Sequence, residues 1–190
     1  MKKNIILRTI NKCKKYLRFW KLFQVSETNK CRSSLAKYCK GDGLDIGYGG
    51  DPIVKSAICI DLPRPYAKYR KYPQHLHGDA RDLYWFKNQC LDYVFSSHLL
   101  EDFKNTEIVL NEWIRVLKLG GYLVLYLPDE QKYRNYCKKK GVPSNIHHMH
   151  EDFSIDYINK ILKKRTDIEI IHTRFPAGIY SFELVIQKVK

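Results

Sequence analysis

The sequence predicts an α/β fold in which helices pack on the faces of a mostly parallel sheet. From residue 43 onward, short apolar runs alternate with segments long enough to form a helix. This alternation is typical of parallel strands joined by crossover connections. Two further strand-like runs close the chain, and their short separation predicts a terminal antiparallel pair.

Seven apolar runs are interpreted as strands, at 44–46, 57–60, 75–77, 91–95, 122–127, 168–173 and 181–189. Helical periodicity is clearest over Glu107–Lys118, where Trp113 lies in the middle of an apolar stripe. Gly120-Gly121 then stops this helix and turns the chain into the fifth strand. A later helix is predicted over about 154–164, with Ser154 as its N-cap.

The positive charge of the chain is concentrated near its N-terminus. Its 190 residues, enough for one domain, carry a formal net charge of +14. Residues 1–40 hold 12 of the 34 Lys/Arg and one of the 20 Asp/Glu, a net of +11, which leaves +3 for the rest. A nearly neutral main domain disfavours a broad nucleic-acid-binding face.

We interpret residues 1–40 as a basic helical arm and residues 41–190 as the main domain. Residues 4–23 place apolar side chains, among them Leu17 and Trp20, on one stripe of a helix with lysines mainly outside it. This helix can pack on its own domain, which we favour, but a targeting presequence or peripheral contact with an anionic membrane stays open. A second helix, at about 33–38, leads into the domain.

The cysteines and apolar runs predict a cytoplasmic protein. Six cysteines lie at positions 13, 31, 39, 59, 90 and 137 without any C-x-x-C pair, which favours reduced structural thiols over disulfides or a zinc site. No apolar run is long enough for a membrane span or a signal peptide. The sequence indicates no oligomeric state.

A glycine-rich turn follows the first predicted strand and indicates a ligand site. In the segment 43–52, Gly47, Gly49 and Gly50 let the backbone bend tightly and approach a ligand. Asp61 ends the second strand, where a carboxylate can accept hydrogen bonds from both ribose hydroxyls of a nucleoside. The carboxyl ends of parallel strands form one edge of a sheet, so these residues predict a nucleoside site there.

The same turn argues against a dinucleotide-dependent dehydrogenase. The pattern G-x-G-x-x-G, counted from Gly47, requires a glycine at position 52, which is proline. The crossover to the second strand leaves room for only one helical turn, whereas a pyrophosphate is bound by the N-terminus of a full helix.

Several motifs, in order, resemble those of the class I S-adenosylmethionine-dependent methyltransferases, type 11 in particular. The segment 44–50 (LDIGYGG) is similar to their motif I, and Gly78-Asp79-Ala80 to their adenine-contacting segment. The segment 91–102 (LDYVFSSHLLED) is similar to their signature after strand four, and 113–125 (WIRVLKLGGYLVL) to their helix and Gly-Gly turn before strand five. Asp51 and Asp102 depart from the family's usual glycine and histidine.

This resemblance implies a three-layer Rossmann-like sandwich, whose mostly parallel seven-stranded sheet ends in a C-terminal antiparallel hairpin. It implies methyl transfer, with S-adenosyl-L-methionine as the cofactor. The residues expected to bind the cofactor are Asp45, Gly47, Tyr48, Gly49, Asp61, Asp79, Ala80 and Ser96.

Three histidines in predicted loops are candidates for a catalytic role. His98 follows the fourth strand, and His148 and His150 belong to the cluster 145–152, which we expect to lie over the cofactor crevice. They are candidate general bases or acceptor-binding groups. His147, His148 and His150 are too close in sequence to face one ion together in regular structure, so we expect no metal.

The preferred acceptor is a small molecule, a sugar or a glycan precursor. The segment Phe95-Ser-Ser-His98 lacks the Asp/Asn-Pro-Pro-Tyr type motif of methylases that modify base amino groups, and no Pro-Cys pair supplies a carbon-5 nucleophile. Two alternatives stay open: a non-catalytic S-adenosylmethionine-binding interaction module, and an RNA methyltransferase.

Overall fold

The computed structural model describes residues 25–64 and 72–190, and the predicted helix at 4–23 lies outside them. A seven-stranded sheet has the order β3-β2-β1-β4-β5-β7-β6. The strands are β1 (Gly43–Ile46), β2 (Ile58–Asp61), β3 (Leu76–His77), β4 (Leu91–Ser97), β5 (Leu117–Pro128), β6 (Ile168–Ala177) and β7 (Ser181–Lys188). The first five are parallel, and β7 runs antiparallel between β5 and β6. The predicted fold class is confirmed.

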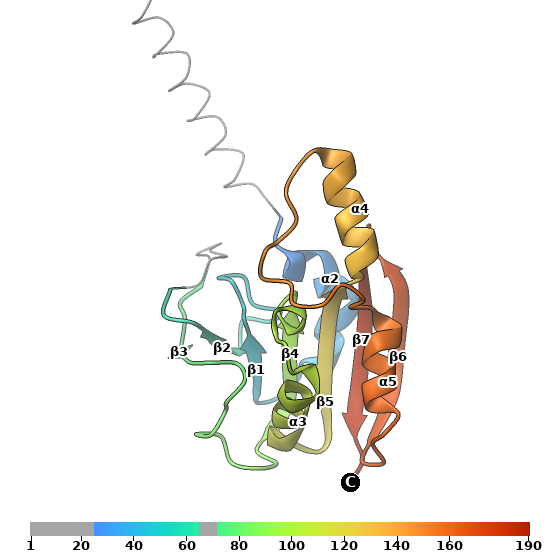
Figure 1. Cartoon of the computed structure of the whole chain (residues 1–190). Coiled ribbons are helices and arrows are strands. Elements are labelled where there is room, and N and C mark those ends of the chain that lie inside the picture. Colours follow the sequence, from blue (N-terminus) through green and yellow to red (C-terminus); the bar gives the residue numbers. More distant parts are fainter. Residues whose placement is uncertain (1–24, 65–71) are drawn as a thin grey trace, which may run out of the picture.

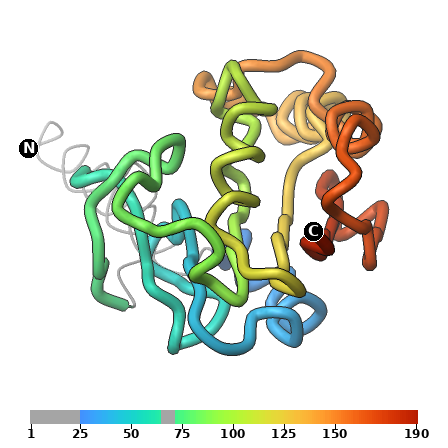
Figure 2. The backbone as a smooth tube through the Cα atoms, turned by 90° about the horizontal axis from the view of Figure 1, so that it is seen from below, coloured from blue at the N-terminus to red at the C-terminus, as the bar shows by residue number. Residues whose placement is uncertain are grey.

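Helices cover both faces of this sheet (Figures 1 and 2). Helix α2 (Glu27–Leu35) lies on one face and continues into the short turn η1 (Ala36–Tyr38). Helices α3 (Thr106–Val116) and α5 (Ile155–Leu162) lie on the other face. Helix α4 (Glu130–Lys140) stands at the edge of the sheet where the parallel strands end, and the turn η2 (Leu100–Asp102) follows β4 near the same edge.

The alternation of side chains along each central strand divides the core into two layers. In β5, Leu123 and Leu125 pack toward α3 and α5, whereas Val124 and Tyr126 pack toward α2. Residues of one strand point alternately to opposite faces, and both faces of this sheet are covered. The strands therefore read as continuous apolar runs in the sequence.

Three helices differ from the sequence prediction. Helix α3 ends at Val116 and β5 begins at Leu117, so Gly120-Gly121 lie within β5 and do not stop the helix. The helix expected at 33–38 begins earlier, at Glu27, because the Ser26 hydroxyl accepts a hydrogen bond from the Asn29 amide and caps it. Residues 25–40, assigned to the basic arm by charge, therefore include a helix packed on the sheet. Helix α4 was not predicted, because only Glu130 and Cys137 are buried along it and no apolar stripe marks it.

The ends of α4 nonetheless carry recognisable signals. The Asp129 carboxylate accepts a hydrogen bond from the Lys132 amide at the first turn. Gly141 adopts a left-handed conformation after the last turn, with φ of 65°. None of the helices in the described ranges is long and apolar enough to span a membrane.

We predict different costs for alanine at the two glycines before the main part of β5. Gly120 has φ of 80° and no neighbouring atom closer than 4.0 Å to an added Cβ, so Gly120→Ala should cost about 1–2 kcal/mol through backbone strain alone. At Gly121 an added Cβ would lie 2.9 Å from the Lys118 carbonyl oxygen and 3.1 Å from two others. Gly121→Ala should therefore lower the free energy of unfolding more, as measured by urea denaturation. An equal or smaller loss at Gly121 would contradict this packing.

Candidate active site

A cavity of about 610 Å³ opens at the carboxyl ends of the parallel strands, within the size range of small-molecule sites. Its strand-end wall comes from the loops that follow β1, β2 and β3. Gly47, Tyr48, Gly49, Asp61, Asp79 and Ala80 belong to this wall. Its outer wall comes from the start of α2, from η2, from α4 and the segment that follows it, and from the β6–β7 turn. Glu27, Glu101, Asp102, Tyr133, His148 and Tyr180 belong to the outer wall.

The glycine turn is tied to the end of β2 by backbone hydrogen bonds. The Gly47 amide donates to the Ile60 carbonyl (2.8 Å), and the Gly49 amide donates to the Asp61 carboxylate (3.2 Å). Both glycines have positive φ, and a Cβ on Gly47 would lie 2.7 Å from the Leu99 side chain. Only glycine fits Gly47 without a shift in its neighbours, so the turn stays open on the cavity side.

Asp61 and Asp79, two of the residues expected to bind the cofactor, both line the cavity. Asp61 also accepts a hydrogen bond from the Leu62 amide (2.8 Å), and burial raises the pKa of its carboxyl group. The Asp79 carboxylate is paired with the Arg81 guanidinium. Ala80 is held in place because its carbonyl accepts a hydrogen bond from the Trp113 indole of α3 (2.7 Å).

Asp45 and Ser96, also predicted to bind the cofactor, do not line the cavity. Both are fully buried within their strands. The Asp45 carboxylate accepts a hydrogen bond from the Ile53 amide (2.6 Å), and the Ser96 hydroxyl donates to the Ile46 carbonyl (3.1 Å). Because both side chains are engaged in holding β1 and the loop after it, they position the strand-end wall from beneath.

The structure brings two of the three candidate histidines to the cavity. His98 and His148 line the cavity. His150 lies instead near the N-terminal end of α3, where its Nε2 donates a hydrogen bond to the Phe103 carbonyl (2.9 Å). The His98 Nε2 lies 3.0 Å from the Ser181 hydroxyl, and burial lowers the pKa of His98 to about 4, so its ring is neutral at pH 7.

His148 is held by a carboxylate behind it. Its Nδ1 lies 2.6 Å from the Glu130 carboxylate at the start of α4, and the ring is almost fully buried. Arg134, one turn further along α4, pairs with the same carboxylate (2.6 Å). A ring nitrogen this close to a carboxylate donates its proton to it, which leaves Nε2 as the acceptor nitrogen.

Several outer-wall residues were not foreseen from the sequence. Tyr180 donates a hydrogen bond to Glu27 (3.0 Å), and its ring packs edge-on against Tyr133 at 5.2 Å between ring centroids. These three residues lie on the β6–β7 turn, α2 and α4, and only tertiary packing brings them together. The one local signal is that Glu27 is the single acid among residues 1–40.

Comparison with known families decides what this arrangement is. A family model described as a methyltransferase domain matches residues 41–125, a range that holds the glycine turn, Asp61, Asp79 and β4. Residues 41–125 are a methyltransferase domain, and the fold is that of the class I, Rossmann-like S-adenosylmethionine-dependent enzymes. No curated protein sequence matches this chain.

Several solved structures, two of them described as methyltransferases, share the fold of this protein. A methyltransferase of Archaeoglobus fulgidus has a TM-score of 0.66 at 17% identity, and the match covers 91% of this chain and 99% of that one. A methyltransferase of Thermotoga maritima has a TM-score of 0.62 at 20% identity, over 98% and 99% of the two chains. The PH0226 protein of Pyrococcus horikoshii has a TM-score of 0.64 at 18% identity, over 84% and 88%.

The strand-end wall of the methyltransferase fits S-adenosylmethionine. The glycine turn brings backbone to the cavity without a Cβ at Gly47 and Gly49, and the Asp61 carboxylate stands beside it. A carboxylate in this place can accept both ribose hydroxyls. The wall carries no helix N-terminus of the kind that binds a pyrophosphate, because the described crossover from β1 to β2 contains turns and no helix.

We predict that Asp45 makes the stability of the enzyme depend on pH. Burial raises the pKa of Asp45 to about 8, whereas an aspartate in the unfolded chain has a pKa of about 4. Between these values the folded chain holds a proton that the unfolded chain has released, so the free energy of unfolding falls as pH rises. Asp45→Asn removes this dependence. The free energy of unfolding of Asp45→Asn, relative to that of the wild type, should therefore rise by more than about 1 kcal/mol from pH 5 to pH 8.

Urea denaturation at the two pH values measures this difference, and the exposed Asp152→Asn serves as the matched control. If the difference in free energy of unfolding between Asp45→Asn and the wild type were the same at both pH values, the buried carboxyl would titrate as it does in the unfolded chain.

Proposed function

We propose that this methyltransferase acts on a small polar acceptor, such as a sugar or a glycan precursor. The observation that carries the proposal is the composition of the outer wall, where three carboxylates lie beside two tyrosine rings and a histidine. Carboxylates accept hydrogen bonds from hydroxyl or amino groups. Aromatic rings give an apolar surface for the carbon face of such a molecule.

The same wall disfavours a nucleic acid as the acceptor. Glu27 and Asp102 line it, and Glu130 lies directly behind His148. A phosphate backbone would approach this acidic surface against electrostatic repulsion. The nearly neutral charge outside residues 1–40 supports the same choice.

We assign complementary roles to the two walls. When bound, S-adenosylmethionine would supply an electrophilic methyl group to a lone pair of the acceptor, with S-adenosylhomocysteine as the leaving group, and a base would take the acceptor's proton. The glycine turn and Asp61 hold the donor in a fixed position. His148 faces the acceptor with its Nε2 lone pair and can bind it or take its proton. Neutral His98 shapes the floor between the two walls.

We further propose a cytoplasmic location. All five cysteines in the described ranges are free thiols, and four of them are buried. Free buried thiols are typical of proteins in a reducing compartment. Contact of residues 4–23 with a membrane stays a prediction from the sequence.

Methyl transfer from S-adenosylmethionine carrying a tritiated methyl group tests the acceptor class. We expect label in members of a panel of sugars, nucleotide sugars and small amines, and none in total RNA. His148→Ala should lower kcat by about a hundredfold or more and leave the affinity for S-adenosylhomocysteine unchanged, because the histidine lies on the outer wall.

His172→Ala is the matched control, since His172 lies on β6 and does not line the cavity. Label in RNA alone, or full activity of His148→Ala on a small acceptor, would contradict the proposal.

A further inference from the structure

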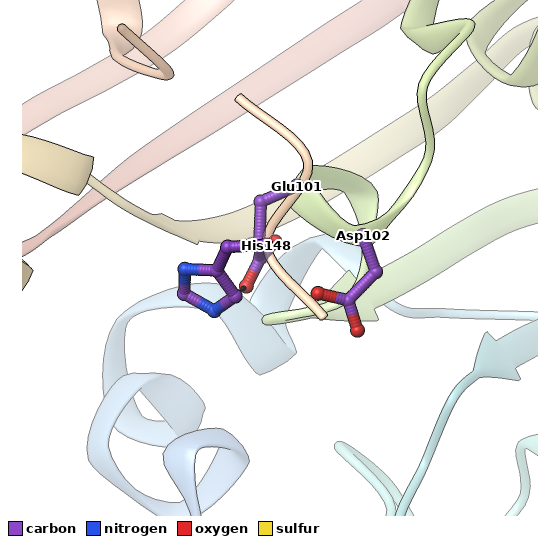
Figure 3. Close-up of side chains that lie close together, drawn as sticks. All are labelled: Glu101, Asp102 and His148. Carbon is purple, nitrogen blue, oxygen red and sulfur yellow. Dashed lines mark ion pairs between the residues drawn. The ribbon is translucent and has the colours of Figure 1, made fainter. Parts of the chain in front are cut away.

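Three potential metal ligands meet in the outer wall. Glu101 and Asp102 come from η2, and His148 reaches them from the segment after α4 (Figure 3). One ligand atom of each residue lies within 4.8 Å of the other two. Among the described residues, this is the one group of three or more potential metal ligands that meets this distance. Two ligands of one divalent ion, each about 2.1–2.3 Å from it, are at most about 4.5 Å apart. Small side-chain rotations therefore bring all three onto one ion.

Glu101 is the first sign that this cluster holds a ligand. Its side chain is 1% exposed, and neither carboxylate oxygen has a hydrogen-bond partner in the part of the chain that the structure describes. A buried carboxylate without partners is strongly unfavourable, and proteins resolve such cases by protonation, by pairing or by metal coordination. Burial raises the pKa of Glu101, and a bound cation would favour its anionic form.

The orientation of His148 is the second, independent sign. Its Nδ1 is engaged by Glu130, so the lone pair of Nε2 is free, and Nε2 lies 3.7 Å from Oε1 of Glu101. These two atoms are too far apart for a hydrogen bond to each other, and one ion can bind both. The pairing of carboxylate, histidine and open Nε2 is the arrangement that orients metal-binding histidines in proteins.

We propose that Glu101, Asp102 and His148 bind one divalent cation of the Mn²⁺ type. Two carboxylates with one imidazole suit first-row divalent ions, because the carboxylates favour Mg²⁺ and Mn²⁺ and the imidazole favours the transition metals. Glu130 is a positioning residue, which fixes the tautomer of His148. The expectation that no metal binds concerned adjacent histidines, and this cluster uses only one of them.

The cation faces the cavity, which suggests its role. Three protein ligands leave open coordination positions on an octahedral ion, and all three residues line the cavity. These positions can hold hydroxyl or carbonyl oxygens of the acceptor and place it opposite the strand-end wall. With the ion bound, Nε2 of His148 is a ligand, so His148 acts on the acceptor through the ion and does not take its proton directly. This role rests on the proposed function, whereas binding of the ion does not.

Electron paramagnetic resonance of Mn²⁺ tests the site directly, because the six-line signal of free Mn²⁺ falls when the ion binds. The full chain, treated with chelator and titrated with Mn²⁺, should bind one ion per chain. Glu101→Gln and, separately, Asp102→Asn should weaken this affinity at least about tenfold. The matched control is Glu151→Gln. The Glu151 side chain is 91% exposed and lies outside the cluster, although Glu151 is only three residues from His148.

S-adenosylhomocysteine binding by each variant confirms that it is folded. Absence of Mn²⁺ binding to the wild type at millimolar concentration, or unchanged affinity in both cluster variants, would overturn the site. Mn²⁺ binding without methyl transfer to any small acceptor would support the site and count against the proposed function.

Discussion

The hydrogen bond from the Gly49 amide to the Asp61 carboxylate joins the ends of β1 and β2, and the strand-end wall depends on it. The turn can reach Asp61 only because Gly47 and Gly49 adopt positive φ. Beneath it, Asp45 holds the following loop through the Ile53 amide. Burial raises the pKa of the Asp45 carboxyl group, which shows that burying this group costs free energy. Asp45 nevertheless occupies this position, where its hydrogen bond holds the loop beside the expected cofactor site.

The outer wall is built differently, from side chains of segments that are far apart in the chain. The start of α2, η2, α4 and the β6–β7 turn converge on it, and few of its groups are supported by regular backbone ladders. Glu130 has a central place, because it pairs with Arg134 on one side and orients His148 on the other. The polar groups of this wall are therefore fixed by charge and hydrogen bonding, while the strand-end wall is fixed by sheet geometry.

Much of the fold could be predicted because both faces of the sheet are covered, so that each strand is an apolar run in the sequence. The strand-end wall could be predicted for a related reason: glycines and acids placed directly after parallel strands must lie on one edge. The directions of Asp45 and Ser96 could not be predicted. A motif names positions, whereas the side a strand residue faces depends on what packs there.

Apart from His98 and the cluster 145–152, the outer wall escaped prediction because its signals are not periodic. Helix α4 has caps at Asp129 and Gly141 but no apolar stripe. Tyr180 reaches Glu27 only through the packing of β7 beside β5 and of α2 on the sheet. The burial of Glu101 likewise follows from several segments that cover it, although the sequence shows only an acid after a strand.

Thermal unfolding with and without S-adenosylhomocysteine tests the central claim, that the glycine turn and Asp61 form the cofactor site. At about a hundred times its dissociation constant, the ligand should stabilise the wild type by roughly 2.7 kcal/mol and raise Tm by several degrees. NADH should produce no shift, and Asp61→Asn should lose most of the shift while keeping its own fold. No shift with S-adenosylhomocysteine, or an equal shift in Asp61→Asn, would contradict the account.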